Sequence, residues 1–292
     1  MRRVRQLAGA AWDLALSVLM LAALAPALAA PYAAAVRTAG ALGRFLLPRT
    51  PFAARIAENV ALVRPDLQPR AVAAAGGDNF GRQIVEFARM SDFAARPALR
   101  RATGLEHLRA AAAAGRGALI VSAHFGNWDA IRLAARDAGV EVGIIYRRFN
   151  NPVFDWLART RIRRAGGPVL WKGLPGQKAM LRRLRQGGAI LVLLDQRLGG
   201  GPTLPFLGRP AQTAGAVAAM ALKSGVPLIP AVAVRAADGV SFDVTFEPPV
   251  QAPDADAAMR AIHDRYAAWI DAAPGQWFWL HRRWKGVGEN ED

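Results

Sequence analysis

Short apolar runs alternate with amphipathic segments between residues 117 and 196 of this chain. The apolar runs have the length of strands: "GALIVSA" (117–123), "VEVGIIYR" (140–147), a short run near 169–171, and "AILVLLDQ" (189–196). Helical patterns lie between them at 127–139, 152–165 and 176–186. Continuously apolar strands that are separated by helices form parallel sheets buried on both sides. We therefore expect an α/β fold with a mainly parallel sheet covered by helices on both faces.

The flanking segments extend this fold. Residues 55 to about 108 are predicted to be helical, because apolar positions such as Ile84, Val85 and Phe87 follow a 3.6-residue period. After the alternation, "TAGAVAAMALKSG" predicts a helix that ends at Gly225. The runs "VPLIPAVAVR" and "SFDVTFEP" predict a strand pair near the sheet edge, and a last helix is expected at about 254–272.

The N-terminal segment has the pattern of a membrane anchor. Residues 14–36 carry no charged side chain and are long enough to cross a bilayer, and Arg2, Arg3 and Arg5 precede them. A signal peptide cleaved after Ala29 and a helix lying in the membrane plane are the alternatives. We divide the chain into an N-terminal membrane-anchoring apolar helix at 1–45, a folded domain at 46–286 and a disordered acidic tail at 287–292.

The composition limits partners and chemistry. A formal net charge of +16 indicates anionic partners, which are nucleic acid, anionic lipid or an acidic carrier protein. The chain has no cysteine, which excludes disulfides, thiolate metal sites and a cysteine nucleophile. No serine lies in a G-x-S-x-G context. A covalent intermediate on cysteine or serine is therefore disfavoured.

The stretch "SAHFGNWDA" (122–130) holds the main candidate for catalysis. His124 leaves the carboxyl end of a predicted strand, where open α/β sheets bind ligands, and Asp129 lies in the first turn of the next helix. A carboxylate on one imidazole nitrogen would leave the other nitrogen free to act as a general base. The backbone N–H groups of Gly126 and Asn127 would face a developing oxyanion at the helix N-terminus. In the alternative interpretation, neighbours satisfy the hydrogen bonds of His124, and Asp129 is favoured there by the helix dipole.

Longer motifs carry a resemblance to a known family. "GLEHLRAAAAAGRGALIVSAHFGNWD", "YRRFNNPVFDWLARTRIRRAGG", "LLDQRLGGGPTLPFLGRPAQTAGAVAAMALKSGVPLIP" and "WLHRRWK" occur in the family's order. The sequence resembles the lipid A late acyltransferases, which are lauroyl and myristoyl transferases within the glycerolipid acyltransferases that share an H-x4-D/E signature. The resemblance covers about residues 40–286 and makes 46–286 the catalytic domain.

The resemblance implies roles for individual residues. His124 would be the general base and Asp129 its orienting acid, where many lipid A enzymes carry Glu. The residues expected to bind substrate are Gly126, Asn127, Tyr146, Arg147, Asn150, Arg161, Arg163, Asp195, Gln196 and Arg197. Two of these expectations have structural alternatives: Arg161 and Arg163 on a solvated helix face, and Asp195 as a structural partner of Arg197. No metal and no cofactor is expected.

The resemblance implies a function in which a general base activates the acceptor's own hydroxyl. We expect an acyl chain to move from an acyl carrier protein or acyl-CoA thioester, the co-substrate, to a hydroxyl of a phosphorylated lipid, foremost a lipid A precursor. An ornithine lipid or a lysophospholipid is the alternative acceptor. The expected partners are acyl carrier protein, the lipid acceptor and the phospholipid bilayer, at the inner membrane of a Gram-negative bacterium with the catalytic domain facing the cytoplasm.

Two other classes stay open. A nucleic-acid-binding protein would explain the charge and the aromatic and basic segment "QWFWLHRRWK", which by the resemblance is expected at a membrane interface and not on nucleic acid. An exported α/β hydrolase would explain the cleavage pattern that ends at Ala29.

Overall fold

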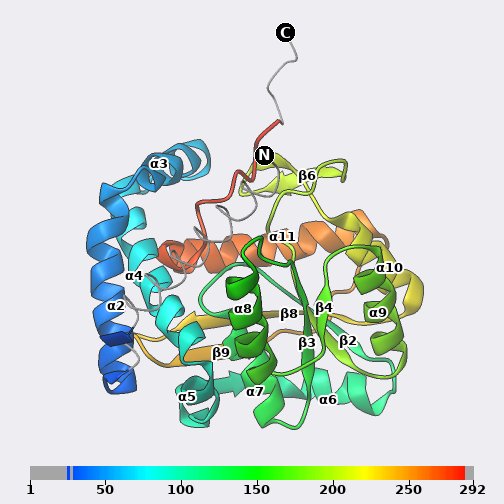
Figure 1. Ribbon diagram of the computed structural model, residues 1–292. Coiled ribbons are helices and arrows are strands. Elements are labelled where there is room, and N and C mark those ends of the chain that lie inside the picture. Colours follow the sequence, from blue (N-terminus) through cyan, green and yellow to red (C-terminus); the bar gives the residue numbers. More distant parts are fainter. Residues whose placement is uncertain (1–24, 27–28, 287–292) are drawn as a thin grey trace, which may run out of the picture.

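The structure is a computed structural model that describes residues 25–26 and 29–286 (Figure 1). In this part of the chain one sheet has seven strands in the order β1-β9-β8-β2-β5-β3-β4. The strands are β1 (Arg100–Thr103), β2 (Ala118–Ser122), β3 (Val142–Tyr146), β4 (Val169–Trp171), β5 (Ala189–Leu193), β8 (Leu228–Arg235) and β9 (Phe242–Phe246). Every neighbouring pair is parallel except β8 and β9. The expected mainly parallel α/β fold is confirmed.

Helices cover both faces of the sheet. Those that follow the strands are α6 (Leu105–Ala113), α7 (Trp128–Asp137), α8 (Pro152–Arg164), α9 (Leu174–Arg185), α10 (Gly215–Ser224) and α11 (Ala255–Ala272). The alternation of side chains along a strand divides the core into two clusters. In β2, Leu119 and Val121 join a cluster with α9, α10 and α11, whereas Ala118 and Ile120 join one with α7 and α8.

A helical layer precedes the sheet. It consists of α2 (Tyr32–Leu46), α3 (Phe52–Val63), α4 (Pro69–Ala88) and α5 (Met90–Ala94), with the 3₁₀ helices η1 (Leu47–Arg49) and η2 (Pro97–Leu99). Figure 1 shows α2 and α4 side by side. The two helices can approach closely because each has a glycine at the contact. A Cβ on Gly43 of α2 would lie 2.0 Å from the carbonyl oxygen of Gly77 of α4.

This packing changes the assignment of the N-terminal segment. Tyr32, Ala35 and Val36 are core residues under α4 and α5, although residues up to 45 were assigned to the anchor. Within residues 25–26 and 29–286, no helix combines the length and the apolar character needed to span a bilayer. Residues 1–24 and 27–28 of the predicted anchor, and the acidic tail at 287–292, lie outside the described residues.

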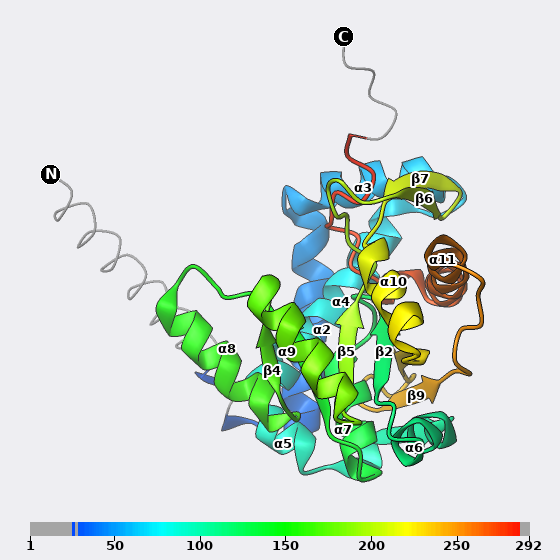
Figure 2. The same ribbon diagram turned by 90° about the vertical axis from the view of Figure 1, so that its right-hand side faces the viewer.

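The structure also contains strands that the sequence pattern did not reveal. The helical prediction for residues 55–108 was wrong at its end, where β1 pairs with β9. β6 (Thr203–Phe206) and β7 (Arg209–Gln212) form a separate antiparallel hairpin, which lies above α11 in both views (Figures 1 and 2). Strands of four residues are too short to show a period. The predicted strand pair near the sheet edge is confirmed as β8 and β9, which lie next to the edge strand β1.

Candidate active site

The imidazole of His124 contacts the carboxylate of Asp195. The two residues follow neighbouring strands, because β2 and β5 are paired in parallel with Ser122 opposite Leu193. Each lies two positions beyond that last pair. Nδ1 of His124 is 2.8 Å from Oδ1 of Asp195, and the His124 backbone N–H donates to Oδ2 at 2.9 Å. Strand register therefore brings the pair together at the carboxyl edge of the sheet.

A third group holds the carboxylate from the C-terminal segment. Nε1 of Trp277, which follows the 3₁₀ helix η3 (Pro274–Gln276), donates to Oδ2 of Asp195 at 2.8 Å. Phe125 and Trp277 form an antiparallel bridge, and the Phe278 N–H donates to the His124 carbonyl. The side chain of Asp195 is 2% exposed and that of His124 is 22% exposed. The acid is thus enclosed while the imidazole keeps an accessible edge.

The electrostatics of the pair favour a charged imidazole ring. Burial lowers the pKa of His124, but the charge of Asp195 and its hydrogen bond outweigh this effect, so the pKa lies above its ordinary value. Burial likewise raises the pKa of Asp195, and His124 and Trp277 together bring it below the ordinary value. An ionised Asp195 accepts the proton of Nδ1, which leaves Nε2 with a lone pair in the neutral ring. This nitrogen is the one able to take a proton from a substrate.

The expected contact between His124 and Asp129 was wrong. Oδ1 of Asp129 is 2.8 Å from Nη1 of Arg132, one helical turn further along α7, and both side chains are buried. Asn127 caps α7 by accepting the Asp129 N–H, which places Asp129 on the buried face of the helix. Burial raises the pKa of the Asp129 carboxyl despite the arginine. Asp129 therefore stabilises the start of α7 rather than orienting the imidazole.

One of the two expected oxyanion donors is occupied. The Gly126 N–H donates to the carbonyl of Gln276 at 2.9 Å. Gly126 has φ +53°, and a Cβ there would lie 1.8 Å from the carbonyl oxygen of Ala233, so only glycine fits. The N–H of Asn127 has no acceptor within the described residues, and it remains a candidate donor.

The residues of the second motif lie apart from His124. The Tyr146 hydroxyl donates to Oδ1 of Asp155 at 3.0 Å and is buried, and burial with this contact raises the pKa of Tyr146 to about 12. Its hydroxyl is therefore occupied within the protein. Arg147 and Asn150 are exposed on the loop before α8, and Arg163 is exposed on α8. Arg161 is partly buried, and its side chain lines a cavity.

Gln196 and Arg197, which follow Asp195, differ in position: Gln196 contacts the imidazole of His124, whereas Arg197 is directed elsewhere. The amide nitrogen Nε2 of Gln196 is 3.3 Å from Nε2 of His124. Gln196 thus covers the ring nitrogen that a substrate hydroxyl would approach. The guanidinium of Arg197 lies beside Gly199 and Gly286. The alternative in which Asp195 pairs with Arg197 was wrong, because both oxygens of Asp195 are taken by His124 and Trp277.

An apolar cavity of about 580 Å³ lies beside the first turn of α7, which follows the loop that carries His124. Its walls come mainly from α4, α5 and α8 and include Phe80, Ile84, Phe87, Met90, Phe154 and Leu157. Asn127, Trp128 and Asp129 line it on the side of α7. The ring of Trp128 meets His124 edge-on with centroids 5.3 Å apart. Trp128 thus contacts both the cavity and the imidazole, and a long apolar chain would fit the apolar walls of this cavity.

Comparison with known proteins identifies the family of the chain. The model of a family described as bacterial lipid A biosynthesis acyltransferase matches residues 10–286. The chain belongs to this family. It is 32% identical to the lipid A biosynthesis lauroyltransferase of Escherichia coli (strain K12) over 195 residues, which are 62% of the chain and 60% of that relative. It is also similar to a phosphatidylinositol mannoside acyltransferase of Mycobacterium tuberculosis (strain CDC 1551 / Oshkosh), at 28% identity over 62% of the chain and 58% of the relative.

A third relative is the lipid A biosynthesis acyltransferase of Haemophilus influenzae (strain ATCC 51907 / DSM 11121 / KW20 / Rd), with 24% identity over 65% of the chain and 60% of the relative. In these three relatives the matched part covers about three fifths of their length.

The structure identifies site residues that the sequence alone had not. Trp277 holds Asp195, and Gln276 fixes the loop after His124. Trp277, Trp279 and Trp284 are 3%, 2% and 7% exposed, so these three rings pack inside the protein, and the placement of the segment at a membrane interface stays a prediction. The same alternation of aromatic and basic residues occurs in exposed segments and in segments packed against the core. The sequence pattern therefore cannot distinguish the two, whereas the packing does.

Proposed function

We propose that this chain is an acyltransferase that moves a fatty acyl group from a thioester donor to a hydroxyl of a phosphorylated lipid. The observation that carries the proposal is the His124–Asp195 pair, together with an apolar cavity of α4, α5 and α8 that Trp128 links to the imidazole. The cavity would hold the acyl chain and the pair would activate the acceptor. Membership of a lipid A acyltransferase family makes a lipid A precursor the first candidate acceptor.

The mechanism follows from Nε2 of the imidazole, where the acceptor hydroxyl would replace the contact with the amide nitrogen of Gln196. Nε2 of His124 takes the proton of the acceptor hydroxyl while that oxygen bonds to the thioester carbonyl carbon. The carbonyl oxygen becomes an oxyanion, for which the Asn127 N–H is the candidate donor. The carbon–sulfur bond then breaks, and the imidazolium returns its proton to the leaving sulfur. Asp195 stays ionised throughout and stabilises the imidazolium. No metal or cofactor takes part in this scheme.

The donor is acyl carrier protein or acyl-CoA. Acyl carrier proteins are acidic, and a net charge of +16 favours docking of an acidic partner and of anionic headgroups. We assign the charge to these partners rather than to nucleic acid.

The likeness to a phosphatidylinositol mannoside acyltransferase supports a second acceptor class. An ornithine lipid or a lysophospholipid would present its hydroxyl to the same base.

We further propose that the domain lies on the cytoplasmic face of a bacterial inner membrane. Four apolar side chains of α2 and α3, Leu42, Phe45, Leu46 and Phe52, are each more than half exposed. Arg44 and Arg49 lie between them in the sequence, and Arg55 follows three residues after Phe52. Exposed apolar groups beside arginines favour contact with an anionic membrane surface. We call these four apolar side chains the α2–α3 apolar face.

The acceptor is best identified by the mass of the product. The purified protein in detergent is given an isotopically labelled acyl thioester, on acyl carrier protein or on CoA in separate reactions, with a lipid extract from Gram-negative cells. We expect labelled lipid with wild type and none with His124→Ala, and the mass of that lipid names the acceptor. Equal labelling by both proteins would refute the role of His124.

A further inference from the structure

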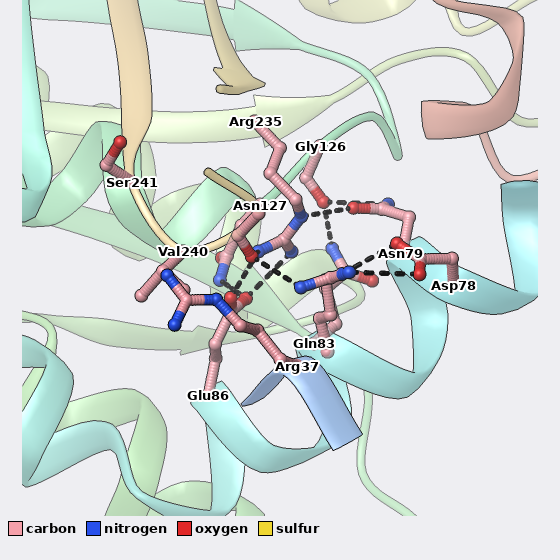
Figure 3. Close-up of polar contacts among 12 residues, drawn as sticks. Arg37, Asp78, Asn79, Gln83, Glu86, Gly126, Asn127, Arg235, Val240 and Ser241 are labelled. Atoms are coloured by element: carbon pink, nitrogen blue, oxygen red, sulfur yellow. Dashed lines mark hydrogen bonds and ion pairs between the residues drawn. The ribbon is translucent and has the colours of Figure 1, made fainter. Parts of the chain in front are cut away.

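A buried ion pair lies behind the loop that carries His124. Glu86 of α4 is fully buried, and its Oε2 is 3.0 Å from Nη2 of Arg235 at the end of β8 (Figure 3). The second nitrogen, Nη1, donates to Oε1 of Glu86. Burial of two charges is costly unless hydrogen bonds satisfy the remaining atoms of both groups. The stability of this pair therefore depends on the other hydrogen bonds of the Glu86 carboxylate and the Arg235 guanidinium.

The carboxylate of Glu86 holds the side chain of Asn127. Nδ2 of Asn127 donates to Oε2 of Glu86 at 2.8 Å, while its Oδ1 accepts the N–H of Asp129. Asn127 thus connects the ion pair to the first turn of α7. Its side chain can rotate only if the capping bond and the bond to Glu86 are both lost.

The guanidinium of Arg235 holds the preceding peptide through Asn79. Nε of Arg235 donates to Oδ1 of Asn79 at 3.0 Å, and Nδ2 of Asn79 is 3.3 Å from the carbonyl oxygen of Gly126. Gln83, one turn along α4 from Asn79, also donates to this oxygen. Figure 3 shows both amide side chains of α4 directed at Gly126.

These contacts set the direction of one peptide group. In a trans peptide the C=O and the following N–H point in opposite directions. Because Asn79 and Gln83 hold the Gly126 carbonyl, the Asn127 N–H is directed away from them. The Gly126 N–H is tied to Gln276 on the other side. The backbone from His124 to Asn127 is therefore held at each peptide.

We infer that Glu86, Arg235 and Asn79 are positioning residues, which keep the Gly126–Asn127 peptide and the imidazole of His124 in the arrangement that acyl transfer requires. This inference rests on the proposed function. Neither Glu86 nor Arg235 contacts His124, so both act through the loop. Loss of the network is expected to slow the chemical step, because oxyanion donors and bases act only in the right orientation.

The test compares the network with a second ion pair that does not touch the loop. Arg100 of β1 has a fully buried side chain and lies 2.7 Å from Asp137 at the other end of α7. The variants are Glu86→Gln and Asn79→Ala in the network and Asp137→Asn as the control. Each protein is tested for kcat and donor KM, for its melting temperature, and for hydrogen exchange of the backbone at 124–128.

We expect the network variants to lower kcat by about 10- to 100-fold with an unchanged donor KM. Complete loss of an oxyanion donor costs about 10²- to 10³-fold, and these variants misalign the Asn127 N–H without removing it. Amide exchange at 124–128 should become faster in both. Asp137→Asn should lower the melting temperature but leave kcat and the exchange of this loop unchanged. Wild-type kcat in folded Glu86→Gln and Asn79→Ala would overturn the inference.

Two further outcomes are decisive. If Glu86→Gln does not fold, the double variant Glu86→Gln/Arg235→Gln removes both charges, and it should fold and remain slow; recovery of wild-type kcat would assign the pair to stability alone. If wild type itself transfers no acyl group, the proposed function fails, and the exchange measurement alone tests the network. Unchanged exchange at 124–128 would then overturn the positioning role.

Discussion

His124 and Asp195 lie two residues beyond the last paired positions of adjacent parallel strands, with Nδ1 and Oδ1 2.8 Å apart. The two side chains are 71 residues apart in the sequence. They meet because β2 and β5 are neighbouring strands of the sheet. Asp129, five positions from His124, belongs instead to the buried pair with Arg132.

The pH dependence of the reaction should reflect the protonation of His124 in its contact with Asp195. A general base works in its neutral form, so kcat/KM should rise with pH through a midpoint above 6.5, the ordinary pKa of histidine, because Asp195 raises the pKa of His124. In Asp195→Asn the negative charge is gone while burial remains, so the midpoint should move to lower pH. The plateau should fall as well. A midpoint that rises or does not move in the variant would show that Asp195 is not the charge acting on His124.

Asp129→Asn should act on stability. Removal of its charge leaves Arg132 buried without an ionic partner, and breaking a buried pair in this way costs about 3–5 kcal/mol of unfolding free energy. Denaturant unfolding measures this loss. The pH midpoint of kcat/KM in the protein that remains folded should stay at the wild-type value. A shifted midpoint would place Asp129 in the electrostatics of His124 after all.

The cavity should set the length of the transferred chain. Ala158 is buried in α8 and lines the cavity, so Ala158→Phe would fill part of the space. Competition between thioesters of different chain length should then shift in favour of shorter chains. A chain shorter by one methylene loses about 0.8 kcal/mol of burial, which sets the scale of the change per carbon. Leu174→Phe, at a side chain that is 74% exposed on α9, should leave the preference unchanged.

The α2–α3 apolar face should bind membranes. Phe45→Asp and Phe52→Asp each remove an apolar side chain worth about 1.5–3 kcal/mol when it is buried, so the affinity for anionic vesicles should fall about tenfold or more. Vesicle sedimentation measures it. Leu222→Asp, on α10, is the matched control and should bind as wild type does. Equal binding by all three variants would exclude this face as the contact.

The sequence predicts much of the fold because its strands are long and continuously apolar. The segments 117–123, 140–147 and 189–196 contain β2, β3 and β5, and helices α7, α8, α9 and α11 lie close to their expected bounds. The four-residue strands β1, β6 and β7 were missed. Residues 32–36 were assigned to the anchor because an uncharged run looks the same in a membrane and in a helix packed against α4.

The active site was only partly predictable for a different reason. His124 was recognised from its place at the end of a strand, and Asp195 was expected at the same edge. The choice of Asp129 as its partner followed the nearness in sequence and the family signature. Strand order, which makes Asp195 the neighbour, is a tertiary property, and so is the arrival of Trp277 from the C-terminal segment. The polar residues of α4, Asn79 and Glu86, carried no signal because they sit within a helical pattern.

The most direct test of the account is the rate of acyl transfer per folded protein for His124→Ala, Asp195→Asn and Asp129→Asn, from labelled acyl carrier protein thioester to a lipid extract. Loss of a general base or of the acid that orients it should reduce the rate by about 10²- to 10⁴-fold. We predict this loss for His124→Ala and Asp195→Asn, and a rate near wild type for the folded fraction of Asp129→Asn. A wild-type rate in Asp195→Asn, with the loss found in Asp129→Asn instead, would contradict the account.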